Sequence, residues 1–335
     1  MTGGTALVLS GGGAPAAYFG AGVIAALEEA GERPTIISGV SAGAINACAV
    51  GAGMDAAALI KMWCNVRWHN IYRPRWDLWR AVNVGRLLRP TTNIAEYALG
   101  AISWTWLLDT APARRTLTGY LGGSDITPPA DLTVIVSAVD ESSGEVVRFC
   151  SELPPEHRNS PQFRQVGLTV DHVMASAAVP LLFPPGRDRD TDRATGAVAA
   201  CGQDPHRLVD AGMVANTPLA PAMRYEPDRV IVVSGGGITR PAPAPDSLGA
   251  AMALLVDNVS YFALTADLAH AETVNRLARV APAATQKRDV PMLLIEPTDL
   301  GFSLNGFLHF TPGQARRIIE YGRDQGEKAL AGWNA

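Results

Sequence analysis

The sequence opens with TALVLSGGGA (residues 5–14) and, after one intervening segment, continues with TIISGVSAG (residues 35–43). Each stretch holds an apolar run of strand length that leads directly into glycines. The segment between them has apolar residues on one helical face and acidic residues on the other, with Gly31 placed to end the helix. The order strand, glycine loop, helix, strand, tight turn, helix predicts an α/β fold. Its mainly parallel central sheet would be covered by helices on both faces.

The rest of the chain continues this alternation. Buried strands are expected where Val, Ile and Leu concentrate, helices where apolar residues recur at helical spacing, and one loop where Asp, Arg and Gly concentrate. The expected strands are 132–137, 145–149, 229–233 and 291–295, the helices are 246–280, whose periodicity leaves room for a break, and 311–330, and the loop is 187–206. Since neither a repeat nor a domain linker is found, we expect a single domain over residues 5–330.

Composition narrows the class of protein. The chain has 335 residues, 47% of them hydrophobic and 18% charged, with a net charge of −4. This mildly acidic balance gives no reason to expect nucleic acid as a partner. The N-terminus lacks the basic region of a signal peptide, and no apolar run reaches the roughly 18 residues of a membrane span. We therefore expect a cytoplasmic protein whose membrane contact, if any, is peripheral, with reduced thiols at Cys48, Cys64, Cys150 and Cys201.

Ser41 is a candidate nucleophile. A serine hydroxyl reacts readily only when it is accessible, has a base beside it and has donors for the developing oxyanion. The turn from Gly39 to Gly43 has the pattern GxSxG between a predicted strand and a predicted helix, and glycines at these positions remove steric conflict from a sharp turn. The following helix directs its N-terminal amides toward the serine. A purely structural turn is the alternative, but the strand–turn–helix context favours the nucleophile.

The run Gly11, Gly12, Gly13 and Ala14 is a candidate oxyanion hole. Consecutive glycines after a strand leave several backbone N–H groups free to point into one cavity, where they stabilise an anion. The alternative is a dinucleotide-binding loop, because residues 11–16 fit the pattern GxGxxA. That loop requires an acidic residue at the end of the second strand. Glu32 has roughly the right spacing but precedes the strand, so the oxyanion hole is favoured.

Asp210 is a candidate base for Ser41. It follows a short apolar run and is flanked by small residues in LVDAGMVANTP (residues 208–218), which lets another segment approach it closely. An aspartate in a loop is more commonly a turn former, which is the alternative. A Ser–Asp–His arrangement also stays open. His309 is the better histidine candidate, because His270 falls in a helical, alanine-rich run.

Together these motifs resemble those of the patatin-like phospholipase family. Its pattern is a glycine-rich loop, GxSxG, an ASxxxP segment that continues to FPP, and a DGG or DGA motif. All four occur here in order, the last two as ASAAVPLLFPP (residues 175–185) and DAG (residues 210–212), and the similarity covers nearly the whole chain. The resemblance implies a three-layer α/β sandwich and a Ser41–Asp210 dyad without histidine, with the oxyanion hole at residues 11–14. It further implies hydrolysis of lipid acyl esters through an acyl-enzyme, with neither metal nor cofactor.

The chain departs from the family pattern in two places. Pro15 and Ala16 stand where the family has Arg or Lys followed by Gly, so a positive charge beside the oxyanion loop is missing. Ala211 stands where the family has glycine, and this is costly if the backbone there requires a positive φ. We expect these departures to alter substrate preference rather than to abolish activity. Two alternative functions stay open: an acyltransferase or thioesterase with the same dyad, and a catalytically silent lipid-binding module.

Six of the seven tryptophans lie between Trp63 and Trp106, interleaved with arginines, in a cap-like segment at about residues 61–110. Tryptophan and arginine together suit a membrane interface or an acyl-binding cap. A helical cap over the sheet with solvated arginines is an equally good interpretation. Our hypothesis is that this segment lines the acyl pocket and contacts anionic bilayers. Equal binding to neutral and anionic vesicles would exclude its electrostatic part.

Overall fold

The computed structural model describes residues 3–75, 105–155, 162–187, 207–235, 244–245, 248–281, 287–298 and 306–333. Most of the predicted cap-like segment, including Trp76, Trp79 and Trp104, therefore lies outside the described residues. The same holds for Cys201 and for nearly all of the predicted loop over 187–206.

The central sheet forms around the two strands predicted at the start of the chain. β1 (Thr5–Leu9) lies between β2 (Ile36–Val40) and β12 (Arg229–Val233) and is parallel to both. β13 (Met292–Ile295) continues the parallel sheet beside β12, and β6 (Thr133–Asp140) continues it beside β2. The prediction of a mainly parallel central sheet is confirmed.

Antiparallel strands complete the sheet on the side of β6. β7 (Val146–Cys150) and β11 (Arg207–Asp210) both pair antiparallel with β6, β10 (Gly186–Arg187) pairs with β11, and β8 (Phe163–Gln165) pairs with β7. Two small ribbons lie apart from this sheet: β3 (Arg73–Pro74) with β4 (Leu108–Asp109), and β5 (Asp125–Ile126) with β9 (Leu168–Thr169).

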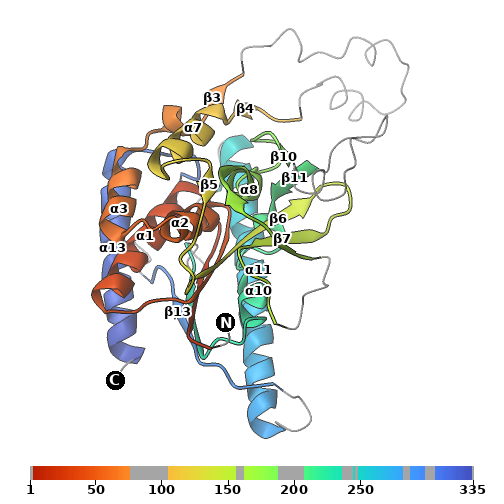
Figure 1. The fold of residues 1–335 in the computed structure, drawn as a ribbon. Helices are drawn as coiled ribbons and strands as arrows, with labels where there is room; N and C mark the ends of the chain where they lie inside the picture. The colour runs from red at the N-terminus through yellow and green to blue at the C-terminus, as the bar shows by residue number, and fades with distance from the viewer. Residues whose placement is uncertain are drawn as a thin grey trace.

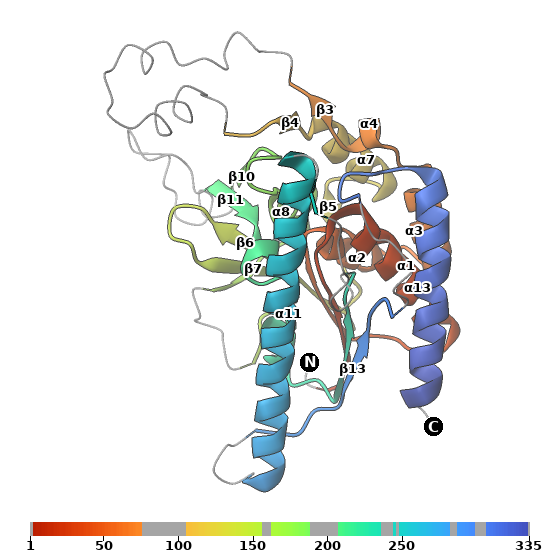
Figure 2. The same cartoon turned by 180° about the vertical axis from the view of Figure 1, so that it is seen from behind.

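Helices cover both faces of the sheet, so the described part of the chain forms three layers (Figures 1 and 2). Successive side chains of a strand point to opposite faces. Leu7 and Leu9 accordingly pack against α1, α2 and α13, whereas Ala6 and Val8 pack in a separate core with α10 and α11. The helices are α1 (Gly13–Glu29), α2 (Ala42–Gly51), α3 (Ala56–Asn65), α4 (Trp68–Ile71), α7 (Ala111–Tyr120), α8 (Val170–Ser176), α10 (Leu219–Met223), α11 (Leu248–Val280), α13 (Pro312–Trp333) and the 3-10 helix η2 (Ala211–Met213).

The helix predicted over 246–280 runs from Leu248 to Val280 without the break for which its periodicity left room. Its buried side explains this continuity. Leu264 packs in the core of that face, and the Asn275 amide exchanges two hydrogen bonds with the backbone of Val290, at 2.7 and 3.1 Å. These contacts hold the middle and the C-terminal half of the helix against the sheet.

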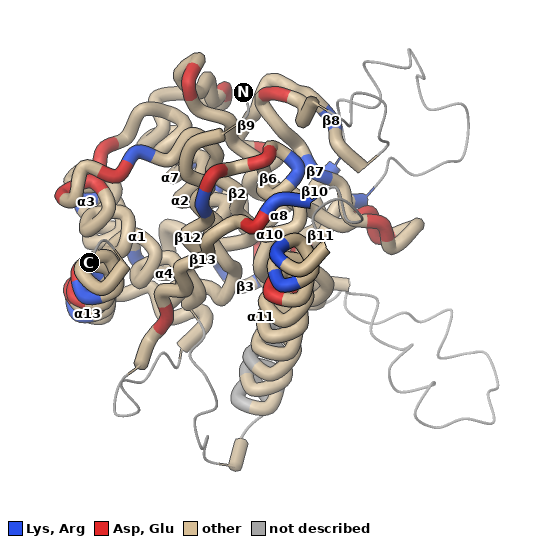
Figure 3. Tube along the Cα trace, turned by 90° about the horizontal axis from the view of Figure 1, so that it is seen from below, with Lys and Arg blue, Asp and Glu red and all other residues tan. Residues whose placement is uncertain are grey.

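On the other face, α13 lies at the edge of the molecule, where it carries both acidic and basic residues (Figure 3). Its inner side packs directly on α1 because glycines bring the two backbones together. A side chain at Gly322 would clash with the carbonyl oxygen of Phe19, and one at Gly22 would clash with the carbonyl oxygen of Ile319. α1 begins at the glycine loop, so this contact anchors the helix whose first turn faces the candidate site.

We expect Gly322→Ala to lower the free energy of unfolding by about 1–3 kcal/mol, because the added methyl group forces two packed backbones apart. Urea denaturation of the variant and the wild type would measure the change. Gly332→Ala is the matched control on the same helix, since a Cβ there meets no atom within 4 Å. Equal stability of the two variants would contradict the close-packing argument.

Candidate active site

Ser41 lies at the sharp turn between β2 and α2. Its backbone has φ 53° and ψ −121°, a conformation that non-glycine residues rarely adopt and that costs roughly 1–3 kcal/mol. The turn is tightly packed. A Cβ at Gly39 would lie 2.5 Å from the carbonyl oxygen of Gly43, and one at Gly43 would clash with the carbonyl oxygen of Leu9. These contacts explain why glycine stands at both positions, as the GxSxG pattern requires.

A buried serine from α8 holds this turn in place. The backbone N–H of Ser41 donates to Ser176 Oγ at 2.9 Å, and the Ser176 hydroxyl donates to the carbonyl oxygen of Ser137 on β6 at 2.7 Å. Ser176 has no exposed surface. Sequence reasoning placed Ser176 only within the ASxxxP motif and did not find this role. Nothing local in the sequence points to it, because the hydrogen bond joins segments far apart in the chain.

The sheet brings Asp210 to Ser41 from the opposite direction. The last residue of β2, Val40, pairs with Ser137 of β6. The last residue of β11, Asp210, pairs with the next residue of β6, Ala138. β7 pairs with these same β6 residues and so takes the other edge of β6. β2 and β11 therefore end head to head on one edge of β6. Adjacent residues of a strand are about 3.3 Å apart, so this register places Ser41 and Asp210 side by side.

The Asp210 carboxylate is buried beside the Ser41 hydroxyl. Burial raises the pKa of Asp210 to about 6, although hydrogen bonding to the Ser41 side chain and to the backbone N–H of Gly212 each lowers it. The Gly212 N–H donates to Oδ1 at 2.7 Å. A carboxyl group with a pKa near 6 is ionised at neutral pH and basic enough to take a proton in the transition state.

Of the four backbone N–H groups in the predicted oxyanion hole, residues 11–14, two already donate hydrogen bonds to backbone carbonyl oxygens. The N–H of Gly11 donates to the carbonyl oxygen of Asn216 at 3.2 Å, and the N–H of Ala14 donates to the carbonyl oxygen of Phe307 at 3.0 Å. Gly12 and Gly13 have φ values of 136° and 66°, which glycine adopts without strain. Within the described residues, their N–H groups have no partner. The candidate oxyanion hole therefore narrows to Gly12 and Gly13, and Asn216 is a supporting residue that sequence reasoning missed.

Both departures from the family pattern are accommodated by the backbone. Pro15 is the third residue of α1, within the first turn, where a residue without an N–H loses no helical hydrogen bond, and it is buried. Ala211 lies in η2 and is not among the described residues with positive φ, so glycine is not required there. Pro15 thus leaves this end of α1 without a charge, whereas Ala211 does not disturb the Asp210 turn.

The two candidate histidines and Glu32 do not join this cluster. His309 and His270 are both exposed, and neither lines the cavities beside Ser41. Glu32 forms an ion pair with Arg229 at the N-terminal end of the parallel strands, opposite the glycine loop. Because a dinucleotide-binding loop needs its acidic residue at the C-terminal end, the position of Glu32 does not support that alternative.

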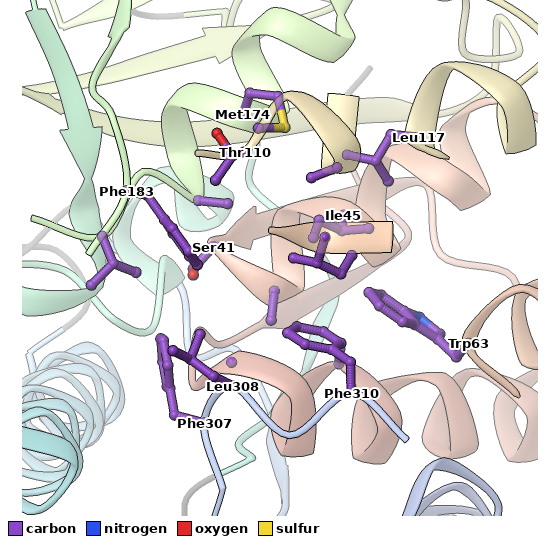
Figure 4. Close-up of a pocket in the computed structure, with 17 residues that line it drawn as sticks. Ser41, Ile45, Trp63, Thr110, Leu117, Met174, Phe183, Phe307, Leu308 and Phe310 are labelled. Carbon is purple, nitrogen blue, oxygen red and sulfur yellow. The ribbon is translucent and has the colours of Figure 1, made fainter. Parts of the chain in front are cut away.

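Two cavities meet at Ser41. The larger extends to one side and is lined almost entirely by apolar side chains (Figure 4). The smaller cavity contains Asp210, Gly12 and Asn216. Ser41, Val179 and Phe307 line both. The Asp210 carboxylate therefore lies in the smaller cavity beside the serine, and the described residues that line the larger cavity include no charged side chain.

The fold and the site define an α/β protein with a candidate serine nucleophile on a strand–helix turn, beside a buried carboxylate and an apolar pocket. Within the described residues, no group of His, Cys, Asp and Glu side chains is arranged to hold a metal ion. In the same part of the chain, no helix has the length and apolar character needed to span a bilayer.

Comparison with known proteins identifies the family. The model of the patatin-like phospholipase family matches residues 7–223, and the chain belongs to this family. Among curated proteins, no sequence matches it significantly. Membership in this family indicates a lipid acyl hydrolase of the serine type.

Solved structures give distant matches. They include VipD from Legionella pneumophila (17% identity, TM-score 0.41), the type III effector protein ExoU (16%, 0.40) and human GIVD cytosolic phospholipase A2 (13%, 0.45). Each alignment covers 98% or 99% of this chain and, respectively, 67%, 53% and 60% of the other protein. The chain thus spans about half to two thirds of their length.

We expect Ser176→Ala to lower kcat about tenfold with little change in KM, because Ser41 loses the group that fixes its backbone. The substitution also leaves the Ser41 N–H and the Ser137 carbonyl unpaired, which costs roughly 1–3 kcal/mol of stability. Steady-state kinetics and the labelling rate with a fluorophosphonate would measure the first effect, with exposed Ser143→Ala as the control. Loss of stability with an unchanged kcat and labelling rate would show that Ser176 has no positioning role.

The pKa of Asp210 predicts how the reaction depends on pH. The base must be ionised, so kcat/KM should fall about tenfold per unit below pH 6 and level off above it. Hydrolysis of a soluble ester between about pH 4.5 and 8 would test this, with His309→Gln as the control that keeps the profile. If the profile instead followed a group with a pKa near 7 and His309→Gln abolished it, histidine would be the base.

Proposed function

We propose that the chain hydrolyses acyl esters of lipids with Ser41 as nucleophile, Asp210 as general base and Gly12 and Gly13 as the oxyanion hole. The observation that carries this proposal is the strained Ser41 beside the buried Asp210, at the mouth of an apolar pocket. These are the groups that acyl transfer needs: a nucleophile, a base, two adjacent N–H donors and a site for the acyl chain.

In the first half-reaction, Ser41 Oγ attacks the ester carbonyl while Asp210 accepts its proton. The carbonyl oxygen becomes negative and is stabilised by the N–H groups of Gly12 and Gly13, at the positive end of α1. When the tetrahedral intermediate collapses, the bond to the leaving alcohol breaks, and Asp210 returns the proton to its oxygen. The acyl group stays on Ser41 as an ester.

In the second half-reaction, a water molecule takes the place of the alcohol. Asp210 accepts one of its protons, the oxygen attacks the acyl carbonyl, and the same N–H groups stabilise the second oxyanion. Collapse breaks the bond to Ser41 Oγ, which recovers its proton from Asp210, and the fatty acid leaves. Asp210 thus takes and returns one proton in each half, and no histidine is needed.

The cavities support an acyl substrate more strongly than a particular head group. Among the described residues that line them, Asp210 is the only charged side chain. Pro15 occupies the position at which the family has a cationic residue. A phospholipid remains the first substrate to test because of the family, and neutral acyl esters and thioesters belong in the same panel.

We expect Ser41→Ala and Asp210→Asn each to lower kcat/KM by about a thousandfold or more, since one removes the nucleophile and the other the base. Intact-mass spectrometry should detect an acyl adduct on the wild type and none on Ser41→Ala. The matched controls are Ser143→Ala and Asp125→Asn, which change exposed residues.

Three results would contradict the proposal or favour one of the alternative functions. An adduct that survives Ser41→Ala would contradict the nucleophile. Accumulation of transferred product when alcohols or amines are added would favour an acyltransferase. A wild type that neither turns over any ester nor reacts with a fluorophosphonate would favour a silent lipid-binding module.

A further inference from the structure

The apolar cavity beside Ser41 has a defined far end. The first turn of α2 forms its floor: Ala42 and Ile45 follow Ser41 along the cavity. Figure 4 shows Ser41 and Trp63 on opposite sides of the cavity, with Ile45 between them. An acyl chain attached to Ser41 and extending along this floor would meet the indole ring of Trp63.

Trp63 is held too firmly to move aside. Its Nε1–H donates to Asn46 Oδ1 at 2.8 Å, and the Asn46 amide in turn donates to the carbonyl oxygen of Ala17 at 2.9 Å. The ring stacks on Phe310, with centroids 6.4 Å apart, and meets the edge of Tyr18 at 5.7 Å. Its side chain is 1% exposed. Rotation of the indole would break a buried hydrogen bond and two aromatic contacts together.

The length of the floor follows from helix geometry. Trp63 is hydrogen-bonded to the side chain of Asn46, whose Cα lies five residues after that of Ser41 and about 7.5 Å further along the helix axis. Carbon–carbon bonds of about 1.52 Å at angles near 111° advance an extended chain by about 1.25 Å per carbon. The floor therefore holds about six carbons beyond the carbonyl.

We propose that Trp63 ends the acyl pocket and makes the protein selective for unbranched acyl chains of about six to eight carbons. This inference rests on the proposed function, since it assumes an acyl chain on Ser41. The lining favours a plain hydrocarbon. Apart from Ser41, Thr110 is the only residue of the described lining with a free polar side-chain group, because the Trp63 N–H is already paired. A hydroxylated or charged chain would leave its polar groups without partners.

The test compares chain-length profiles. Hydrolysis of p-nitrophenyl esters from acetate to palmitate, below their aggregation concentrations, would be measured for the wild type, Trp63→Leu, Trp63→Phe and Ile45→Phe. The rate at which fluorophosphonates of increasing alkyl length phosphonylate Ser41, with loss of fluoride, gives a second readout that is independent of deacylation. Trp333→Leu is the control, because Trp333 lies at the end of α13 and lines neither cavity.

We expect the wild-type kcat/KM to fall about tenfold or more for each step beyond the preferred length, as is usual when a methylene does not fit a hydrophobic pocket. Trp63→Leu should move the optimum to longer chains, Ile45→Phe should move it to shorter ones, and Trp333→Leu should leave it in place. Trp63→Phe, which keeps the ring but is shorter, should shift it less than Trp63→Leu.

The possible failures are distinguishable. If the wild type hydrolyses no ester and reacts with no fluorophosphonate at Ser41, the proposed function itself is wrong. Ser41-dependent hydrolysis whose chain-length profile is the same in every folded variant would overturn only the role of Trp63. If circular dichroism shows that Trp63→Leu does not fold, Trp63→Phe and Ile45→Phe decide the matter, since each predicts a shift of its own.

Discussion

The pairing of two strands with one edge of β6 is the constraint on which the candidate site depends. β2 arrives parallel to β6 and ends at Val40, whereas β11 arrives antiparallel and ends at Asp210, one register position further along. Each strand must stop there because the other occupies the next position. The chain leaves β2 through the sharp turn at Ser41, and it leaves β11 through η2. A hydroxyl and a carboxylate thus meet without any contact between residues close in sequence.

Burial in this junction gives Asp210 a pKa close to that of histidine, the usual base of serine hydrolases. An exposed aspartate is too weak a base at neutral pH, because its usual pKa is near 4. Desolvation raises the pKa, while the Gly212 N–H and the Ser41 hydroxyl keep the ionised form from becoming prohibitively costly. The balance, a pKa of about 6, is close to that of an imidazole. A Ser–Asp pair therefore suffices chemically where the aspartate is buried and hydrogen-bonded in this way.

The features that could be predicted from the sequence depend on local contacts, whereas those that could not depend on contacts between segments far apart in the chain. The strand before Ser41, the helix after it and the glycines around it are local features, and they were predicted from residues 35–50 alone. Asp210 was a candidate base from its flanking residues, but only the family resemblance implied a dyad without histidine, because the approach of Asp210 to Ser41 depends on sheet register. The role of Ser176 was not predicted, since its hydrogen bond to the Ser41 N–H exists only in the folded chain. The same holds for Gly11 and Ala14, whose N–H groups are taken by distant carbonyls.

In the proposed reaction, the two cavities beside Ser41 decide how an ester must bind, because one is lined by apolar side chains and the other contains the Asp210 carboxylate. Ser41 lies at the boundary, so an acyl chain that occupies the apolar side leaves the alcohol half of the ester on the side of Asp210. That is the side on which the leaving oxygen needs a proton. An ester bound the other way round would bury its polar half among apolar side chains and hold its leaving oxygen away from the acid. Hydrophobic burial of the acyl chain thus does more than provide affinity, because it selects the orientation in which one carboxyl group can serve both as base and as acid.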